Sequence, residues 1–243
     1  MGFSPTTVTN HLSERLDFTW HPTAGTDAPI AIIGHGVTGH KDRPLLVAMA
    51  ETLASEGINA LRISYSGNAN SAGQFEESTV LKEVEELGAV LDAMPSSARI
   101  GYIGHSMGAA VGVLRAARDS RIQFLVSLAG IVHTAAFADR EFGTLTPGVD
   151  RMWDKPGCVL STAYMDAMRQ VGDVLEAAKG VRVPWLLVHG TADDLVPVQD
   201  SRDAAGVVPH AQLIEIKDAD HLFTGEPTTE VVRTVADWIK RVR

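Results

Sequence analysis

GYIGHSMGAAVG, at residues 101–112, places one serine, Ser106, between two glycines. The apolar residues before the serine predict a buried strand, and the small and apolar residues after it predict a helix that starts at Met107. A strand that turns directly into a helix strains the residue at the turn, and Gly104 and Gly108 remove side chains that would collide there. The stretch therefore predicts a strand–turn–helix unit that holds the Ser106 hydroxyl clear of the backbone.

The composition is that of a globular protein with one sizeable hydrophobic core. The chain has 243 residues, of which 45% are hydrophobic and 21% are charged. Its formal net charge of -9 repels phosphate backbones and anionic membrane surfaces, and we expect no nucleic-acid partner. Cys158 is the single cysteine, so it can form neither an internal disulfide nor a cysteine metal cluster.

The N-terminal region does not read as a targeting segment. Residues 1–18 lack the charged region and apolar core of a secretory signal. No apolar run approaches the roughly 20 residues that a membrane-spanning helix needs. We therefore expect a cytoplasmic protein without a membrane span.

Short apolar runs alternate with longer amphipathic stretches along the chain. The apolar runs predict strands at 29–34, 58–64, 99–104, 122–128, 183–190 and 211–217. The amphipathic stretches predict helices at 44–56, 76–93, 107–118 and 228–242. Strands that are apolar throughout indicate a sheet covered on both faces. The expected fold class is α/β, with a mostly parallel sheet in a single domain over residues 1–243.

One segment, 133–181, interrupts the alternation of strands and helices. It contains no convincing strand and is too long for a plain loop, so we expect an inserted helical lid. The alternative is one more helical layer with no contact to a site. Apolar side chains of this segment could line a substrate pocket or form the interior of the lid itself; they are Phe137, Phe142, Trp153, Tyr164, Met165 and Met168.

A serine becomes a nucleophile only when a base and an orienting acid stand beside it. Candidates follow two later strands, with Asp193 in the loop after 183–190 and His221 after 211–217. Ser, Asp, His is the chain order that a strand–turn–helix serine motif leads us to expect. Asp194 is the neighbouring alternative for the acid. The other histidines weighed as the base are His35, His105, His189 and His210.

Three motifs together resemble the α/β-hydrolase superfamily: GHSMG at 104–108, HGTADDLVP at 189–197 and DADHLF at 218–223. The resemblance runs from about residue 28 to the C-terminus. Residues 60–87 resemble small bacterial serine esterases, including the cinnamoyl/feruloyl esterase-like group. Those esterases have Asp-x-x-Gly-x-Gly-x-Ser-x-Gly where this chain has Ser64 for the aspartate and Ala69 for the second glycine. The resemblance implies an α/β-hydrolase fold, with Asp193 as the acid of the family's Asp-x-x-Val-Pro motif.

The loop GHGVTGHKD at 34–42 resembles the family's His-Gly-x-x-Gly loop. This resemblance implies that the backbone N–H of Val37 is one donor of an oxyanion hole. The second donor is the N–H of Met107, at the start of the helix after the serine. The residues that we expect to contact substrate are His35, Gly36, His105, Trp153 and Val196.

The function that these motifs imply is hydrolysis of a small-molecule ester. We expect a carboxylesterase for short-to-medium or aromatic acyl esters, which forms an acyl-enzyme on Ser106 and needs no metal and no cofactor. The same residues could serve a thioesterase, a peptidase, an acyltransferase or a cofactor-free perhydrolase. A non-catalytic hydrolase-like binding protein is the third reading. The oligomeric state stays open, with a homodimer as one option.

Overall fold

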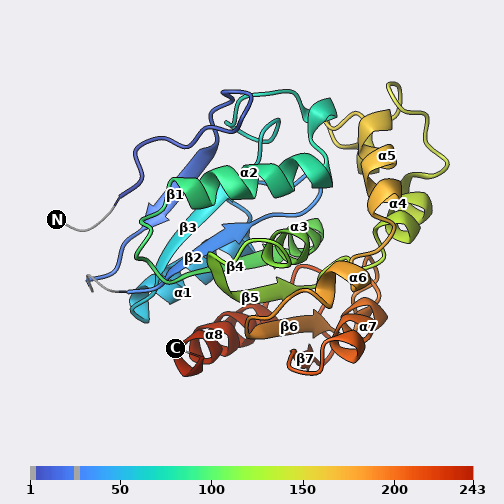
Figure 1. The fold of residues 1–243 in the computed structure, drawn as a ribbon. Helices are drawn as coiled ribbons and strands as arrows, with labels where there is room; N and C mark the ends of the chain where they lie inside the picture. The colour runs from blue at the N-terminus through green and yellow to red at the C-terminus, as the bar shows by residue number, and fades with distance from the viewer. Residues whose placement is uncertain (1–3, 25–27, 243) are drawn as a thin grey trace.

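Seven strands form one sheet in the computed structural model, which describes residues 4–24 and 28–242 (Figure 1). The strands lie in the order β1-β3-β2-β4-β5-β6-β7, and β1 pairs antiparallel with β3 while all other pairs are parallel. Their bounds are β1 Asp17–His21, β2 Ile30–Gly34, β3 Asn59–Ser64, β4 Ile100–His105, β5 Ile122–Leu128, β6 Trp185–Gly190 and β7 Gln212–Ile216. The expected mostly parallel sheet is confirmed.

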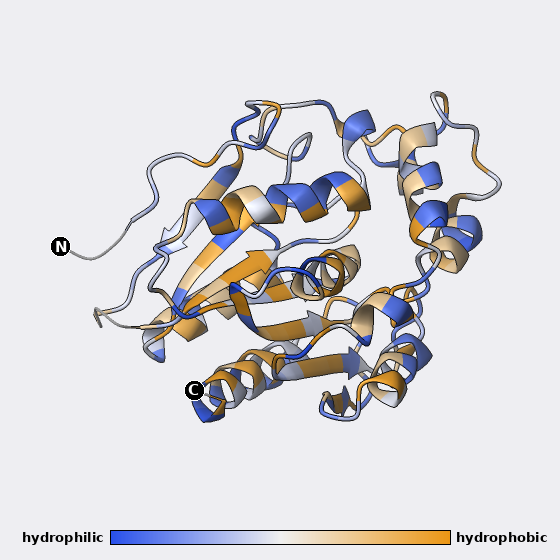
Figure 2. Ribbon diagram, viewed as in Figure 1, coloured by the Kyte–Doolittle hydropathy of each residue, from blue (hydrophilic) through white to orange (hydrophobic). Residues whose placement is uncertain are grey.

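The inner strands are mostly apolar because helices cover both faces of the sheet. Within β2, Ile30 and Ile32 face one side while Ala31 and Ile33 face the other. Helices α1 (Pro44–Ser55) and α8 (Glu226–Arg241) pack on the side of Ala31. Helices α2 (Val80–Asp92), α3 (Met107–Ala116) and α7 (Val198–Val207) pack on the side of Ile30. Figure 2 shows the same pattern, with hydrophobic colour along the strands and hydrophilic colour on the outer turns of α2.

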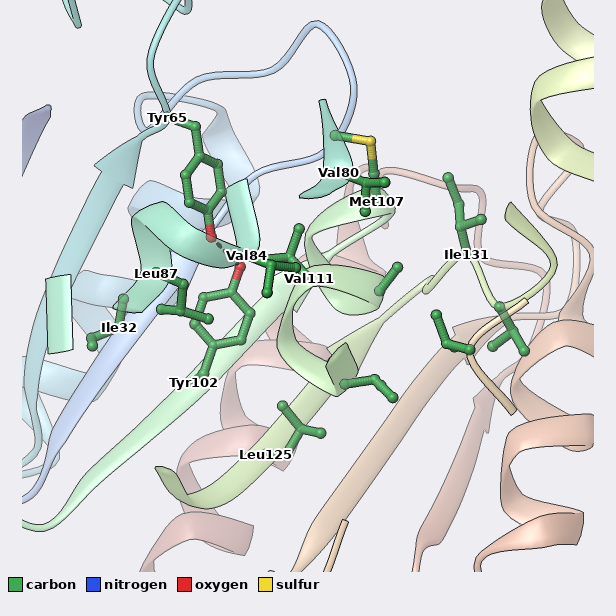
Figure 3. Close-up of a cluster of buried hydrophobic side chains, with 14 of the residues drawn as sticks. Ile32, Tyr65, Val80, Val84, Leu87, Tyr102, Met107, Val111, Leu125 and Ile131 are labelled. Atoms are coloured by element: carbon green, nitrogen blue, oxygen red, sulfur yellow. Dashed lines mark hydrogen bonds between the residues drawn. The ribbon is translucent and has the colours of Figure 1, made fainter. Parts of the chain in front are cut away.

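The core beneath α2 and α3 joins helix and strand side chains (Figure 3). Val84 and Leu87 of α2 meet Tyr102 of β4 there, and the Tyr102 hydroxyl lies 2.7 Å from the hydroxyl of Tyr65. Both tyrosines are fully buried, so this mutual hydrogen bond satisfies two polar groups that would otherwise be unpaired. The packing holds β4, and hence the residue that follows it, in one place.

The segment between β5 and β6 is helical, and it lies beyond the carboxyl ends of the strands (Figure 1). It contains α4 (Thr134–Phe142), a 3-10 turn (Met152–Asp154), α5 (Thr162–Val171) and α6 (Leu175–Ala178). In open parallel sheets, sites form at this edge, because the loops that leave the strands converge there. The helical segment is therefore placed where it can reach a site.

Two elements of the structure were not predicted from the sequence, and one predicted helix starts later in the chain than expected. Strand β1 was not predicted, because its sequence DFTWH is half-buried at a sheet edge and carries little apolar signal. Helix α7 was not predicted either, since most of its surface is polar. Helix α2 begins at Val80 rather than at 76, because residues 75–77 form a separate 3-10 turn and the Thr79 side chain caps the helix by accepting the N–H of Lys82.

Across the described residues, no helix has both the length and the apolar character that crossing a bilayer requires. The expected cytoplasmic location and the homodimer option stay predictions.

Candidate active site

Ser106 occupies the turn between β4 and α3 in a strained backbone conformation. Its φ of 58° and ψ of -122° lie in a region that non-glycine residues rarely adopt. A Cβ on Gly104 would lie 2.2 Å from the Gly108 carbonyl oxygen, and a Cβ on Gly108 would lie 2.5 Å from the carbonyl oxygen of His35. Both glycines are thus required by close backbone approach, which is the geometry that the sequence pattern predicted.

Asp193 and His221 meet at the carboxyl ends of β6 and β7. His221 Nδ1 lies 2.8 Å from Asp193 Oδ2, and the Asp193 carboxyl group is fully buried. The other carboxylate oxygen, Oδ1, accepts the backbone N–H groups of Leu195 at 3.0 Å and Val196 at 2.8 Å. Asp194 is exposed. The structure therefore joins His221 to Asp193 and not to its neighbour.

The Asp193 carboxyl group is held as an anion. Burial by itself would raise the pKa of Asp193, but hydrogen bonds from His189 and His221, the charge of His221 and the Val196 N–H together place it well below its usual range. A fixed carboxylate on Nδ1 keeps the Nδ1–H tautomer of His221. Its Nε2 is then left as the nitrogen able to accept a proton.

Ser106 and His221 line the same cavity, which has a volume of about 600 Å³. The loop after β2 forms another wall, with His35, Gly36 and Val37 lining the cavity. A Cβ on Gly36 would lie 2.5 Å from Ser106 Cβ and 3.0 Å from Ser106 Oγ, so only glycine lets this loop pass so close to the serine. The cavity thus collects the serine, the histidine and the glycine loop predicted from the sequence.

Two backbone N–H groups are candidate oxyanion donors: that of Met107, next to Ser106, and that of Val37, in the cavity wall. Met107 is the first residue of α3, where an N–H has no partner within its own helix. In the part of the chain that the structure describes, no carbonyl or side chain accepts the N–H of Val37. Free N–H groups beside a serine or in the wall of its cavity are the kind of donor that a developing oxyanion needs.

His35 fixes the glycine loop in place as a neutral imidazole. Its Nδ1 donates to the Gly36 carbonyl at 2.9 Å, and its Nε2 accepts the Tyr65 N–H at 3.0 Å. These two contacts together require one protonated and one bare nitrogen. Burial lowers the pKa of His35 to about 4, which agrees with that neutral form.

His105 connects the serine turn to the loop that carries His221. Its Nε2 donates to the His221 carbonyl at 2.9 Å, and the two ring centroids are 4.9 Å apart. Burial, with a smaller contribution from nearby His221, lowers the pKa of His105 to about 3. His105 therefore stays neutral and acts as a fixed hydrogen-bond donor to the backbone of the base.

His189 is a second histidine on the Asp193 carboxylate, which sequence reasoning missed. Its Nε2 lies 3.2 Å from Asp193 Oδ2 and 2.9 Å from the Val196 carbonyl, so this nitrogen carries a proton shared between two acceptors. Its Nδ1 then accepts the Ser201 hydroxyl at 2.7 Å. The sequence suggests His189 only as an alternative for the base. Its position at a strand end, four residues before the acid, was the available signal.

Four of the five residues expected to contact substrate line the cavity: His35, Gly36, His105 and Trp153. Val196, contrary to the expectation, does not line the cavity. The residue is only 1% exposed and its N–H donates to Asp193, so this loop presents Asp194 and Leu195 to the cavity instead. Further lining residues were not singled out from the sequence; they include Arg43, Leu45, Leu46, Lys155, Asp220 and Leu222.

Most apolar side chains of the helical segment pack with one another, in a core that continues beneath α2 and α3. Phe142 is fully buried, with its ring centroid 6.1 Å from that of Phe137 and 5.8 Å from that of Tyr164. Met165 and Met168 are buried in the same core. Of these side chains, Trp153 alone is among the described residues that line the cavity, with its ring 4.8 Å from Phe142. Trp153 therefore fits the expectation of a pocket-lining residue, whereas the other side chains fit the alternative of packing within the protein interior.

Among the residues that the structure describes, no group of three or more histidine, cysteine or acidic side chains could hold a metal ion. The polar groups of the cavity are instead those suited to nucleophilic and acid–base chemistry.

Comparison with known families supports the same fold. The sequence model described as "Alpha/beta hydrolase family" matches residues 31–234. The expected α/β-hydrolase fold, and the resemblance on which it was based, are thereby confirmed.

Individual relatives are distant in sequence but alike in structure. The palmitoyl-protein thioesterase ABHD10, mitochondrial, of Bos taurus is 25% identical over 211 residues, which are 81% of this chain and 68% of the relative. A structure of Est1E from Butyrivibrio proteoclasticus with bound ferulic acid has a TM-score of 0.88 and 23% identity, covering 98% of both chains. The mouse alpha/beta hydrolase domain-containing protein 10 has a TM-score of 0.77 and 20% identity, covering 99% of this chain and 100% of its own. At these identities the two structures establish the fold alone.

Proposed function

The chain belongs to the alpha/beta hydrolase family, and from this premise we propose that it is a serine ester hydrolase in which Ser106, His221 and Asp193 carry the reaction. One observation carries the proposal. A serine held in a strained turn shares a cavity with a histidine whose far nitrogen donates to a buried carboxylate. That combination supplies a nucleophile, a base and an orienting acid together.

The mechanism follows from the arrangement of these groups. Ser106 Oγ attacks the ester carbonyl, and His221 Nε2 takes the serine proton. The N–H groups of Val37 and Met107 stabilise the oxyanion of the tetrahedral intermediate. When the intermediate collapses, His221 gives the proton to the leaving alcohol, and an acyl-enzyme remains on Ser106. A water molecule, deprotonated by His221, then releases the acid and restores the serine.

The three neighbouring histidines act as positioning residues in this proposal. His35 holds the loop of Val37, His105 holds the backbone of His221, and His189 holds the carboxylate of Asp193. Preorganised groups cost little reorganisation when charge develops, which is the main source of transition-state stabilisation in such sites.

The cavity wall supports short-to-medium or aromatic esters. Apolar side chains dominate it, with Leu45, Leu46, Trp153, Leu195 and Leu222 among its lining. Its volume of about 600 Å³ lies within the range of ordinary small-molecule sites. The Est1E structure is described with ferulic acid bound, an aromatic acid that a cavity of this kind could accept.

We also propose that residues 133–181 act as a cap, through one loop rather than through their helices. Trp153 and Lys155 reach the cavity from this segment, while Phe142 and its neighbours are packed in the hydrophobic core. The cap would then set the shape of one wall of the substrate site.

The Ser106→Ala variant provides the test. We expect turnover of p-nitrophenyl esters, measured from acetate to palmitate together with methyl ferulate, to fall by about a thousandfold or more in this variant. Ser120→Ala, at an exposed serine outside the cavity, is the matched control and should behave as the parent protein. Unchanged hydrolysis in Ser106→Ala would refute the assignment, and so would a parent protein that neither cleaves esters nor reacts with a fluorophosphonate probe.

A second candidate is thioester hydrolysis by the same residues. The relative from Bos taurus is named as a palmitoyl-protein thioesterase, which is the observation that favours it. The oxyanion hole and base would act alike, and the leaving group would be a thiolate. Comparing kcat/KM for phenyl butyrate and S-phenyl thiobutyrate separates the two, because the pair differs only in the atom that leaves.

A further inference from the structure

Two cationic side chains line the cavity next to the oxyanion loop. Arg43 precedes α1, and Lys155 follows the 3-10 turn of the cap. Arg43 Nη2 donates to the Thr38 carbonyl at 3.1 Å, and Lys155 Nζ donates to the Thr38 hydroxyl at 2.8 Å. Since Thr38 directly follows Val37, both cations stand one residue from a proposed oxyanion donor.

Neither cation has an acidic partner among the described residues, although acidic side chains outnumber basic ones in this chain. Two other cations, Lys41 and Arg62, by contrast both form an ion pair with Asp42 at 2.8 Å. The carboxylates that line the cavity, Asp194 and Asp220, belong to the loops of Asp193 and His221 and form no ion pair with Arg43 or Lys155.

The two cations are close enough to repel each other. Partial burial, followed by the charge of Arg43, lowers the pKa of Lys155. Like charges held together beside an apolar wall are unfavourable unless an anion joins them. An anion on the ligand would bring both cations a charge-assisted hydrogen bond.

The loop that presents Lys155 is strained. Trp153 and Asp154 have φ values of 48° and 55°, a conformation that costs energy at each non-glycine residue. The Trp153 Nε1–H donates to Glu141 at 3.2 Å, and the Lys155 ammonium lies 5.5 Å from the Trp153 ring centroid. The strain therefore places an aromatic face and a positive charge side by side at the cavity.

We propose that the preferred substrates are esters that carry a free carboxylate, which Arg43 and Lys155 bind while Trp153 packs against the apolar part. The inference rests on the proposed ester hydrolysis and specifies its substrate class. The carboxylate binds beside Thr38, in the cavity that also contains Ser106, and it is a separate group from the ester carbonyl that is cleaved.

Matched ester pairs test this at low ionic strength. Monomethyl adipate and methyl hexanoate differ in a carboxylate on the acyl side, and 4-acetoxybenzoate and 4-acetoxybenzamide differ in one on the alcohol side. We expect kcat/KM for the anionic ester to exceed that for the neutral one by about tenfold or more in one of the pairs. The advantage should shrink as KCl is added, since salt screens charges near the surface.

Charge-removing variants identify the residues. Arg43→Gln and Lys155→Gln should each lower the ratio of anionic to neutral kcat/KM by about tenfold, and Lys155→Arg should retain most of it. A role limited to holding Thr38 would lower both esters alike and leave the ratio unchanged, which would overturn the inference. The absence of any anionic preference in the parent protein would also overturn it. Neutral ester hydrolysis that still depends on Ser106 would then show that the proposed function stands on its own.

Discussion

Asp193 and Asp194 are identical in chemistry and adjacent in the chain, yet their surroundings differ completely. Asp193 is buried and accepts hydrogen bonds from two histidines and two backbone N–H groups, whereas Asp194 faces solvent at the edge of the cavity. A carboxylate that orients a base must be fixed and must stay ionised. The difference between the two residues lies in what each side chain touches.

We expect Asp193→Asn to lower kcat by about a hundredfold to ten-thousandfold, because an amide no longer fixes the required tautomer of His221 or stabilises its cation. Asp194→Asn should cost far less. Steady-state kinetics on p-nitrophenyl butyrate, with circular dichroism to verify folding, compares the two variants. If Asp194→Asn proved the more damaging, the acid would be misassigned.

At the scale of elements, the strand–turn–helix unit depends on close backbone contact between β4, α3 and the loop after β2. Gly104 faces the Gly108 carbonyl, Gly108 faces the carbonyl of His35, and Gly36 faces Ser106. A side chain at any of these positions would push apart the groups that form the site. Stability and activity therefore share the same glycines.

Gly104→Ala should destabilise the fold by several kcal/mol, since its Cβ would stand 2.2 Å from a backbone oxygen that cannot move freely. Gly206→Ala is the matched control. That glycine lies within α7, has no atom within 4 Å of an added Cβ, and should gain about 0.5–1 kcal/mol. Urea unfolding of both variants measures the difference, and equal midpoints would contradict the packing argument.

At the scale of the whole molecule, the interior of the cap is continuous with the core on one face of the sheet, while one loop of the cap reaches the cavity. Phe142 belongs to that core, where it is fully buried, and Trp153 belongs to the cavity, where it is 36% exposed. One aromatic residue thus stabilises the cap while its neighbour contacts the ligand site.

We expect Phe142→Ala to lower the free energy of unfolding by about 3–5 kcal/mol, because it leaves a void in a packed core. Trp153→Ala should mainly raise KM for aryl esters, with a smaller loss of stability. Thermal unfolding and steady-state kinetics on phenyl acetate separate the two effects. A larger loss of stability in Trp153→Ala, or a larger rise of KM in Phe142→Ala, would contradict these roles.

Much of the fold was predictable because its signals are local. Apolar runs such as 29–34 predict buried strands, and the glycine spacing around Ser106 predicts a tight turn. Both predictions are possible because each signal lies within a few consecutive residues. Strand β1 and helix α7 escaped prediction because they are half-buried or largely polar, so their stability comes from neighbours distant in sequence. The position of Val196 away from the cavity escaped prediction for the same reason, since the direction of a side chain within a loop depends on tertiary contacts.

The sequence by itself determined the order and kind of most of the elements, the turn at Ser106, and the chain order of Ser106, Asp193 and His221. Only the tertiary structure decided which groups meet: the carboxylate that joins His221, the histidines at 35, 105 and 189 that hold the site in place, and the two cations beside Thr38. The physical reason is the separation along the chain over which each kind of interaction acts. Periodicity and turn chemistry act between neighbours along the chain, whereas hydrogen bonds, burial and charge act between residues that only the completed fold brings together.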